Sequence, residues 1–209
     1  MIKKTVRIDG VSRGEFYGLM VCAVFFTLGV VMGTFSARTL DTAGTLALRE
    51  SMTGRLGQIV DGTYVAPGFF SVLEAFGRDH LIALFLGFSL LGVFGLPVLS
   101  GVRGFSLSFS IAAFLRAFGP EGLPVALSLF GLGALITIPC FFLLSAQAFG
   151  ASARLGKLVL GAGKVQSEPL FGRRYWVRLG FVCVGIFVAV LLELYATPVL
   201  VAWAGSFLF

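Results

Sequence analysis

One acidic residue stands out in this chain because it lies inside a long apolar segment. Glu193 falls near the middle of the run 179–204, which contains no other charged residue. An ionised side chain at the centre of a membrane helix costs about 2.5–3.5 kcal/mol, so a partner or a proton must neutralise it. Three roles are open: a structural hydrogen bond within a helical bundle, which we favour, a proton or cation pathway, and contact with another protein.

Other residues that catalyse reactions or bind metals are scarce. His80 is the only histidine, which excludes a His-Glu-x-x-His zinc site and a conventional Ser-His-Asp arrangement with a spare imidazole. The Gly-Lys pairs at 156–157 and 163–164 lack the other residues of a phosphate-binding loop. We therefore predict a protein that is not an enzyme and holds no metal or cofactor. We expect His80 at the boundary between water and lipid, directly after Arg78 and Asp79.

Composition identifies the environment of these residues. Of 209 residues, 57% are apolar and only 12% are charged, and the mean hydropathy is +0.98. A soluble domain carries about 25% charge, so the sequence predicts an all-α membrane protein with several spans. We expect one integral membrane domain over 1–209, with an external loop at 38–80, an internal loop at 149–178, and spans near 16–37, 81–102, 105–118, 123–148 and 179–204.

The third of these segments is the shortest. Residues 105–118 are fewer than the roughly 20 that a helix needs to cross a bilayer, so this stretch either crosses or re-enters on one side. A true crossing gathers most of the 16 Lys and Arg residues, including Arg103, on the same side of the membrane. Because cytoplasmic loops carry the excess of cations, we expect five crossings, a cytoplasmic N-terminus and an extracytoplasmic C-terminus.

Prolines and small residues shape the predicted spans. Pro97, Pro139 and Pro198 each remove an amide donor, which predicts kinked or broken helices at membrane depth. Broken helices around a central acid are typical of transporters, although a role in bundle shape is the more common one. Small residues four apart permit close helix contact within the chain or with partners; they are Gly29 with Gly33, and Ser100 with Gly104 and Ser108.

The external loop is predicted to contain an amphipathic helix. Its apolar residues recur at helical spacing; they are Leu48, Met52, Leu56 and Ile59. A second short helix is expected at 71–79. We interpret the loop as a cap on the bundle or as a docking surface for a partner, and the stripe itself as a candidate external interface.

Several motifs together resemble the stage II sporulation protein M family. The most specific is Glu193-x-Tyr195-x-Thr197-Pro198, which is similar to the family's ending. The apolar segment with Pro97 followed by Arg103-Gly104, and the later Pro139, agree with the same family. Arg103 stands where the family often has Lys, which keeps a positive charge but changes the donor geometry.

The resemblance implies a non-catalytic membrane protein that acts in sporulation. Its family role would be to anchor the stage II sporulation proteins D and P, two peptidoglycan-degrading enzymes, at the septum while the mother-cell membrane engulfs the forespore. A homo-oligomer stays open. The alternative hypothesis is a small permease that uses Glu193 and the broken helices. A permease needs a continuous polar path, and the scarcity of polar side chains in the spans favours the scaffold.

Overall fold

Long apolar stretches separated by short turns fold into helices throughout the part of the chain that the structure describes. The computed structural model describes all residues except 1–12, 62, 64–66, 161–171 and 206–209. No strand occurs in the described part. The expected all-α, multi-span fold is therefore confirmed. The helices are α1 (Arg13–Arg38), α2 (Thr42–Val60), α3 (Phe69–Gly87), α4 (Gly92–Phe118), α5 (Leu123–Ala126), α6 (Leu132–Val159), α7 (Arg173–Leu191) and α8 (Thr197–Gly205).

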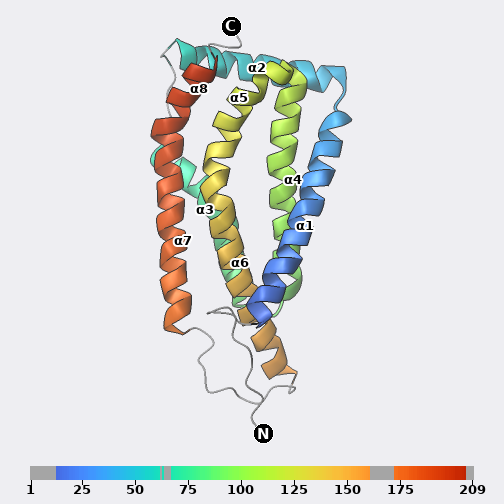
Figure 1. Ribbon diagram of the computed structural model, residues 1–209, viewed down its shortest axis with the longest axis vertical. Coiled ribbons are helices and arrows are strands. Elements are labelled where there is room, and N and C mark those ends of the chain that lie inside the picture. The colour runs from blue at the N-terminus through green and yellow to red at the C-terminus, as the bar shows by residue number, and fades with distance from the viewer. Residues whose placement is uncertain (1–12, 62, 64–66, 161–171, 206–209) are drawn as a thin grey trace.

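Four helical stretches are long and apolar enough to cross a membrane: Gly14–Arg38, Gly92–Phe118, Pro120–Val159 and Arg173–Ala204. They run lengthwise through the molecule, and α2 lies across one end, which we call the capped end (Figure 1). α1 and α7 begin at the other end, where α6 finishes (Figure 1). We call this the basic end because several cations of the described residues are exposed or half-buried there. They are Arg154, Lys157, Arg173, Arg174 and Arg178.

The boundaries expected for the second and third spans are wrong. α4 is one unbroken helix over Gly92–Phe118, so 105–118 is its second half rather than a separate crossing. The chain reverses at 88–91 instead, where Ser89 Oγ accepts a hydrogen bond from the Leu91 amide at 3.1 Å. The charge of Arg103 favoured a loop at that point of the sequence, but a carboxylate on α3 neutralises it within the bundle.

α3 is shorter than the four membrane-length stretches and crosses only part of the bundle, so a fifth crossing stays a prediction. It begins beside the C-terminal part of α7, where the rings of Phe69 and Phe187 lie 6.0 Å apart. It ends near α6, where a Cβ on Gly87 would lie 2.7 Å from that of Ala148. The last part of the expected external loop 38–80, from Phe69 onward, is therefore the first half of α3 and packs against the bundle.

α1 and α4 pack closely through glycines. A side chain on Gly29 would collide with the backbone carbonyl of Gly101, and one on Gly104 would collide with the carbonyl of Phe26. Ser100 Oγ donates to the carbonyl of Cys22 at 2.8 Å. The small residues thus form a seam within the chain, which the spacing allowed but did not distinguish from a contact with another protein.

The prolines disturb the helices less than expected. α4 continues through Pro97 and α6 continues through Pro139 without a break. The irregular turns are the 3-10 helix η1 (Pro120–Gly122) after α4 and two π-helical segments, η2 (Leu127–Gly131) before α6 and η3 (Leu192–Ala196) between α7 and α8. Of the two π-helical segments, η3 is the one near one of the three prolines, since it ends two residues before Pro198.

Candidate functional site

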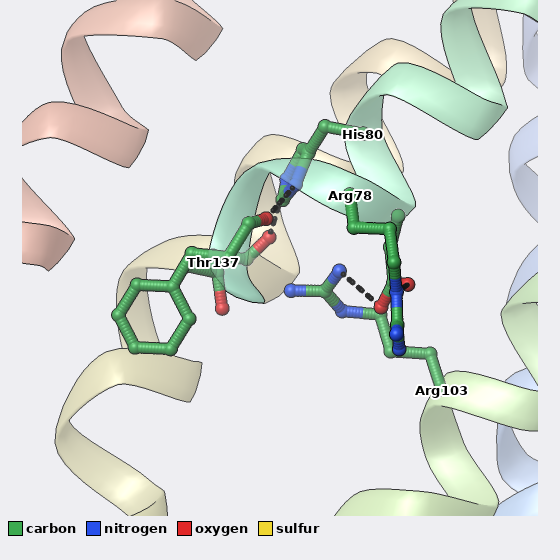
Figure 2. A network of polar contacts seen from close by, with 6 residues as sticks. Arg78, His80, Arg103 and Thr137 are labelled. Atoms are coloured by element: carbon green, nitrogen blue, oxygen red, sulfur yellow. Dashed lines mark hydrogen bonds and ion pairs between the residues drawn. The ribbon is translucent and has the colours of Figure 1, made fainter. Parts of the chain in front are cut away.

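A largely buried ion pair joins α3 to α4. Arg103 Nη1 donates to Asp79 Oδ2 at 3.2 Å, and the side chains of Arg103 and Asp79 are 12% and 27% exposed. Figure 2 shows the guanidinium of Arg103 extending from α4 toward α3. Since α4 is an apolar span, an unpaired arginine here would be strongly disfavoured. The carboxylate allows the bundle to hold this charge.

α6 forms the third wall of this site. The guanidinium carbon of Arg103 lies 4.9 Å from the centroid of the Phe141 ring, a distance at which the ring face attracts a cation. Phe141 is fully buried. Arg103 therefore contacts α3 through charge and α6 through an aromatic ring, so that one side chain links three helices.

His80 lies beside this pair and is not at the membrane boundary as expected. It is 3% exposed. Its Nδ1 lies 2.8 Å from the carbonyl oxygen of Phe76, and its Nε2 lies 3.3 Å from that of Thr137 on α6. A neutral imidazole has one N–H and can donate to only one of these carbonyls, whereas the protonated ring can donate to both. The contact with Thr137 ties α3 to α6.

The ion pair extends to the surface of α3. Arg78 Nε lies 3.8 Å from Asp79 Oδ1, and the Arg78 side chain is 74% exposed. Asp79 thus stands between one exposed and one buried guanidinium (Figure 2 shows both arginines). The chemistry available here is ion pairing and hydrogen bonding. Within the described residues, no three His, Cys, Asp or Glu side chains gather as a metal site.

The sequence did not identify this cluster. The immediate sequence neighbours of Asp79, His80 and Arg103 predict a boundary position for the first two residues and an inner loop for the third. The available signal was the apolar character of the residues on both sides of Arg103, which is high enough for one long span over Gly92–Phe118. An arginine inside such a span requires an acid at the same depth on a neighbouring helix.

Glu193 occupies the π-helical turn η3. Thr197 Oγ1 donates a hydrogen bond to Glu193 Oε2 at 3.2 Å, and the same hydroxyl lies 3.4 Å from the carbonyl oxygen of Leu192. Glu193 is half-buried and continues the buried stripe of Val190 and Thr197 along the same side of the helix. Tyr195 is 74% exposed, so Thr197 rather than Tyr195 supplies a hydroxyl to the acid. Single-turn π segments inside helices often mark functional positions.

The predicted stripe of α2 faces the bundle. Leu56 is 1% exposed, and Met52 and Ile59 pack with it against buried residues of the spans, which are Phe114, Val125, Ala126, Val201 and Ala204. Leu48 is half-buried. The loop was predicted to be a cap on the bundle or a docking surface, and in the structure α2 caps the bundle. Docking of a partner on these four residues stays a prediction.

The match to known proteins agrees with this architecture. The family model described as Stage II sporulation protein M matches residues 22–198. The chain belongs to the stage II sporulation protein M family. Membership makes it a sporulation-related membrane protein, and the family is not a known family of enzymes. The matched region includes the Asp79–Arg103 pair and ends at Pro198. No curated protein and no solved structure matches the chain.

Proposed function

We propose that this family member is a non-catalytic membrane scaffold. In this role it holds the stage II sporulation proteins D and P, which degrade peptidoglycan, at the septum during engulfment. The observation that carries the proposal is α2, a helix laid across the capped end with its apolar stripe inward and residues such as Ala47 and Glu50 exposed. A fixed helix at the water boundary offers a rigid surface to proteins outside the membrane.

The interior supports a framework rather than a conduit. Asp79 is paired with Arg103, His80 contacts two carbonyls, and Ser100 donates to the backbone of α1. Each of these polar groups joins one helix to another. Such bonds hold the helices in fixed positions, which a scaffold requires.

Membrane orientation follows from charge. The basic end carries Arg154, Lys157, Arg173 and Arg174, and loops rich in Lys and Arg remain in the cytoplasm. We therefore assign the basic end to the cytoplasm and the capped end, with α2 and α8, to the outside. In this orientation, α2 lies in the compartment in which peptidoglycan is degraded.

Site-specific photo-crosslinking tests the scaffold. A photoreactive amino acid replaces Ala47 or Glu50 in cells that express the stage II sporulation proteins D and P, and the matched control replaces Val24, which is exposed on α1. We expect covalent products with protein D or P from α2 and none from Val24. No product from either α2 position, at normal protein level, would contradict the proposal, as would equal products from Val24.

A permease is the second candidate, favoured by one observation. Asp79 connects the exposed Arg78 to the buried Arg103, so charged groups lead from the surface of α3 into the bundle. Transport of an anion or of protons through this cluster would require the charges themselves. Uptake by vesicles containing the purified protein, compared with vesicles containing Arg103→Met, separates this candidate from the scaffold, which predicts no uptake in either case.

A further inference from the structure

A basic cleft opens at the start of α7. Arg173, Arg174, Val177 and Arg178 line it, and its volume is about 600 Å³. Arg178 donates to Glu15 of α1 at 3.4 Å. Arg173 and Arg174 are exposed, and no ion pair joins either of them to an acid within the described part of the chain. The cleft therefore presents two guanidinium groups that are available to an anion.

The neighbouring residues indicate the depth of the cleft. Trp176, between Arg174 and Val177, is 57% exposed, and exposed tryptophans collect at the level of the lipid headgroups. Beyond Val177, an exposed apolar stripe follows the helix through Phe181, Val184 and Val188. The charged groups thus lie at headgroup level, and the apolar stripe continues from them into the hydrocarbon region.

The start of the helix adds to the positive field. Gly172 is the N-cap of α7 and has no side chain to bond the first amides of the helix. The amide of Tyr175 is bonded to the carbonyl of Gly172 at 2.9 Å, and the helix dipole favours an anion at this end of the helix. Arginine adds paired N–H donors that match two oxygens of a phosphate.

We propose that this cleft binds the phosphate of an anionic phospholipid. Arg173 and Arg174 hold the headgroup, and an acyl chain lies along Val177, Phe181 and Val184. The apolar stripe selects a lipid over a free phosphate, because only a lipid covers both the charged and the apolar part. The site is independent of the scaffold role and of the surface of α2.

Native mass spectrometry of the detergent-purified full chain tests the proposal. Phosphatidylglycerol and phosphatidylcholine are titrated separately into the wild type and into the double variant Arg173→Gln/Arg174→Gln. We expect the wild type to prefer phosphatidylglycerol. The variant should lose about 30-fold in affinity for it, because each arginine near an anionic surface contributes roughly a fivefold gain. Binding of phosphatidylcholine should not change.

A second double variant controls for overall charge. Arg154→Gln/Lys157→Gln removes two cations from the same end of the molecule but outside the cleft, and we expect it to bind phosphatidylglycerol like the wild type. An equal loss in this variant would overturn the proposal, because general charge would then explain the binding. Displacement of the lipid by millimolar inorganic phosphate would also overturn it, because the ligand would then be a free phosphate. Circular dichroism confirms that both variants fold.

Discussion

Asp79 of α3 and Arg103 of α4 are bonded at 3.2 Å in the interior of the bundle. One turn before Arg103, Ser100 binds α4 to the backbone of α1. α4 is therefore held on one side by a tight glycine seam and on another by an ion pair. α3 is too short to span the bundle, and the pair and His80 fix it in place.

Removing one member of this ion pair should destabilise the protein far more than replacing both members with apolar residues. Arg103→Met leaves the carboxylate of Asp79 with only the exposed Arg78, 3.8 Å away. Loss of one member of a fully buried pair costs about 3–5 kcal/mol, and the cost here should be smaller because Asp79 is 27% exposed. The double variant Asp79→Leu/Arg103→Met removes both charges, and we expect it to recover most of the lost stability. Thermal unfolding in detergent measures both. A double variant no more stable than Arg103→Met would contradict a structural role.

Substitutions of Glu193 distinguish structure from transport. Glu193→Gln keeps an oxygen that can accept from Thr197 and should preserve assembly. Glu193→Leu removes that acceptor, but Thr197 can still donate to the carbonyl of Leu192, at 3.4 Å. The loss should therefore lie near the lower end of the roughly 1–3 kcal/mol range for an unsatisfied group.

Complementation of a sporulation defect, measured beside co-purification of proteins D and P, gives the readout for these variants. A scaffold predicts that Glu193→Gln is active. Loss of activity in Glu193→Gln with the complex intact would overturn the scaffold, because an amide has no proton to exchange and a proton pathway would fail.

The sequence predicted those features that depend on local composition and periodicity. The first and last spans follow from their apolar length, and the inward stripe of α2 follows from the spacing of Met52, Leu56 and Ile59. The all-α class and the family also followed from the sequence. Each of these inferences uses residues that are near one another in the chain.

The features that the sequence did not predict depend on contacts between distant segments. Arg103 lies in a span only because Asp79 neutralises it from another helix, and no local pattern reports that contact. His80 is buried because the carbonyls of Phe76 and Thr137 surround it. Polar residues inside a membrane bundle are therefore the positions at which hydropathy alone gives the wrong boundary.

Gln147 offers a test of packing in the core. It is 4% exposed, and neither atom of its amide has a hydrogen-bond partner in the described structure. An unsatisfied buried polar group costs about 1–3 kcal/mol, so Gln147→Leu should raise the melting temperature. Ser145→Ala, at a buried and likewise unbonded hydroxyl, is the matched control and should give a smaller rise. A lower melting temperature for Gln147→Leu would show that the amide is bonded in the membrane.

The seam between α1 and α4 should not tolerate even one added methyl group. Gly29→Ala places a Cβ against the carbonyl of Gly101, which is backbone and cannot move aside cheaply. Overpacking of this kind costs about 1–3 kcal/mol. Gly54→Ala on α2 meets no atom within 4 Å and should be neutral or slightly stabilising. Thermal unfolding of the two variants compares them, and equal melting temperatures would show that the seam is looser than the structure describes.

Membrane orientation can be decided by labelling single cysteines. Cys22, Cys140 and Cys183 are first replaced by Ala, and a cysteine is then placed at Glu50 on α2 or at Lys157 near the end of α6. Both positions are exposed and lie at opposite ends of the molecule. Because the excess of cations keeps the basic end in the cytoplasm, we expect an impermeant maleimide to label Glu50→Cys in intact cells. Lys157→Cys should react only after the membrane is opened. The reverse pattern would invert the orientation and place α2 in the cytoplasm, where it could not meet enzymes that act on peptidoglycan. Labelling of both positions in intact cells would show that they lie on the same side of the membrane, which contradicts an odd number of crossings between Glu50 and Lys157.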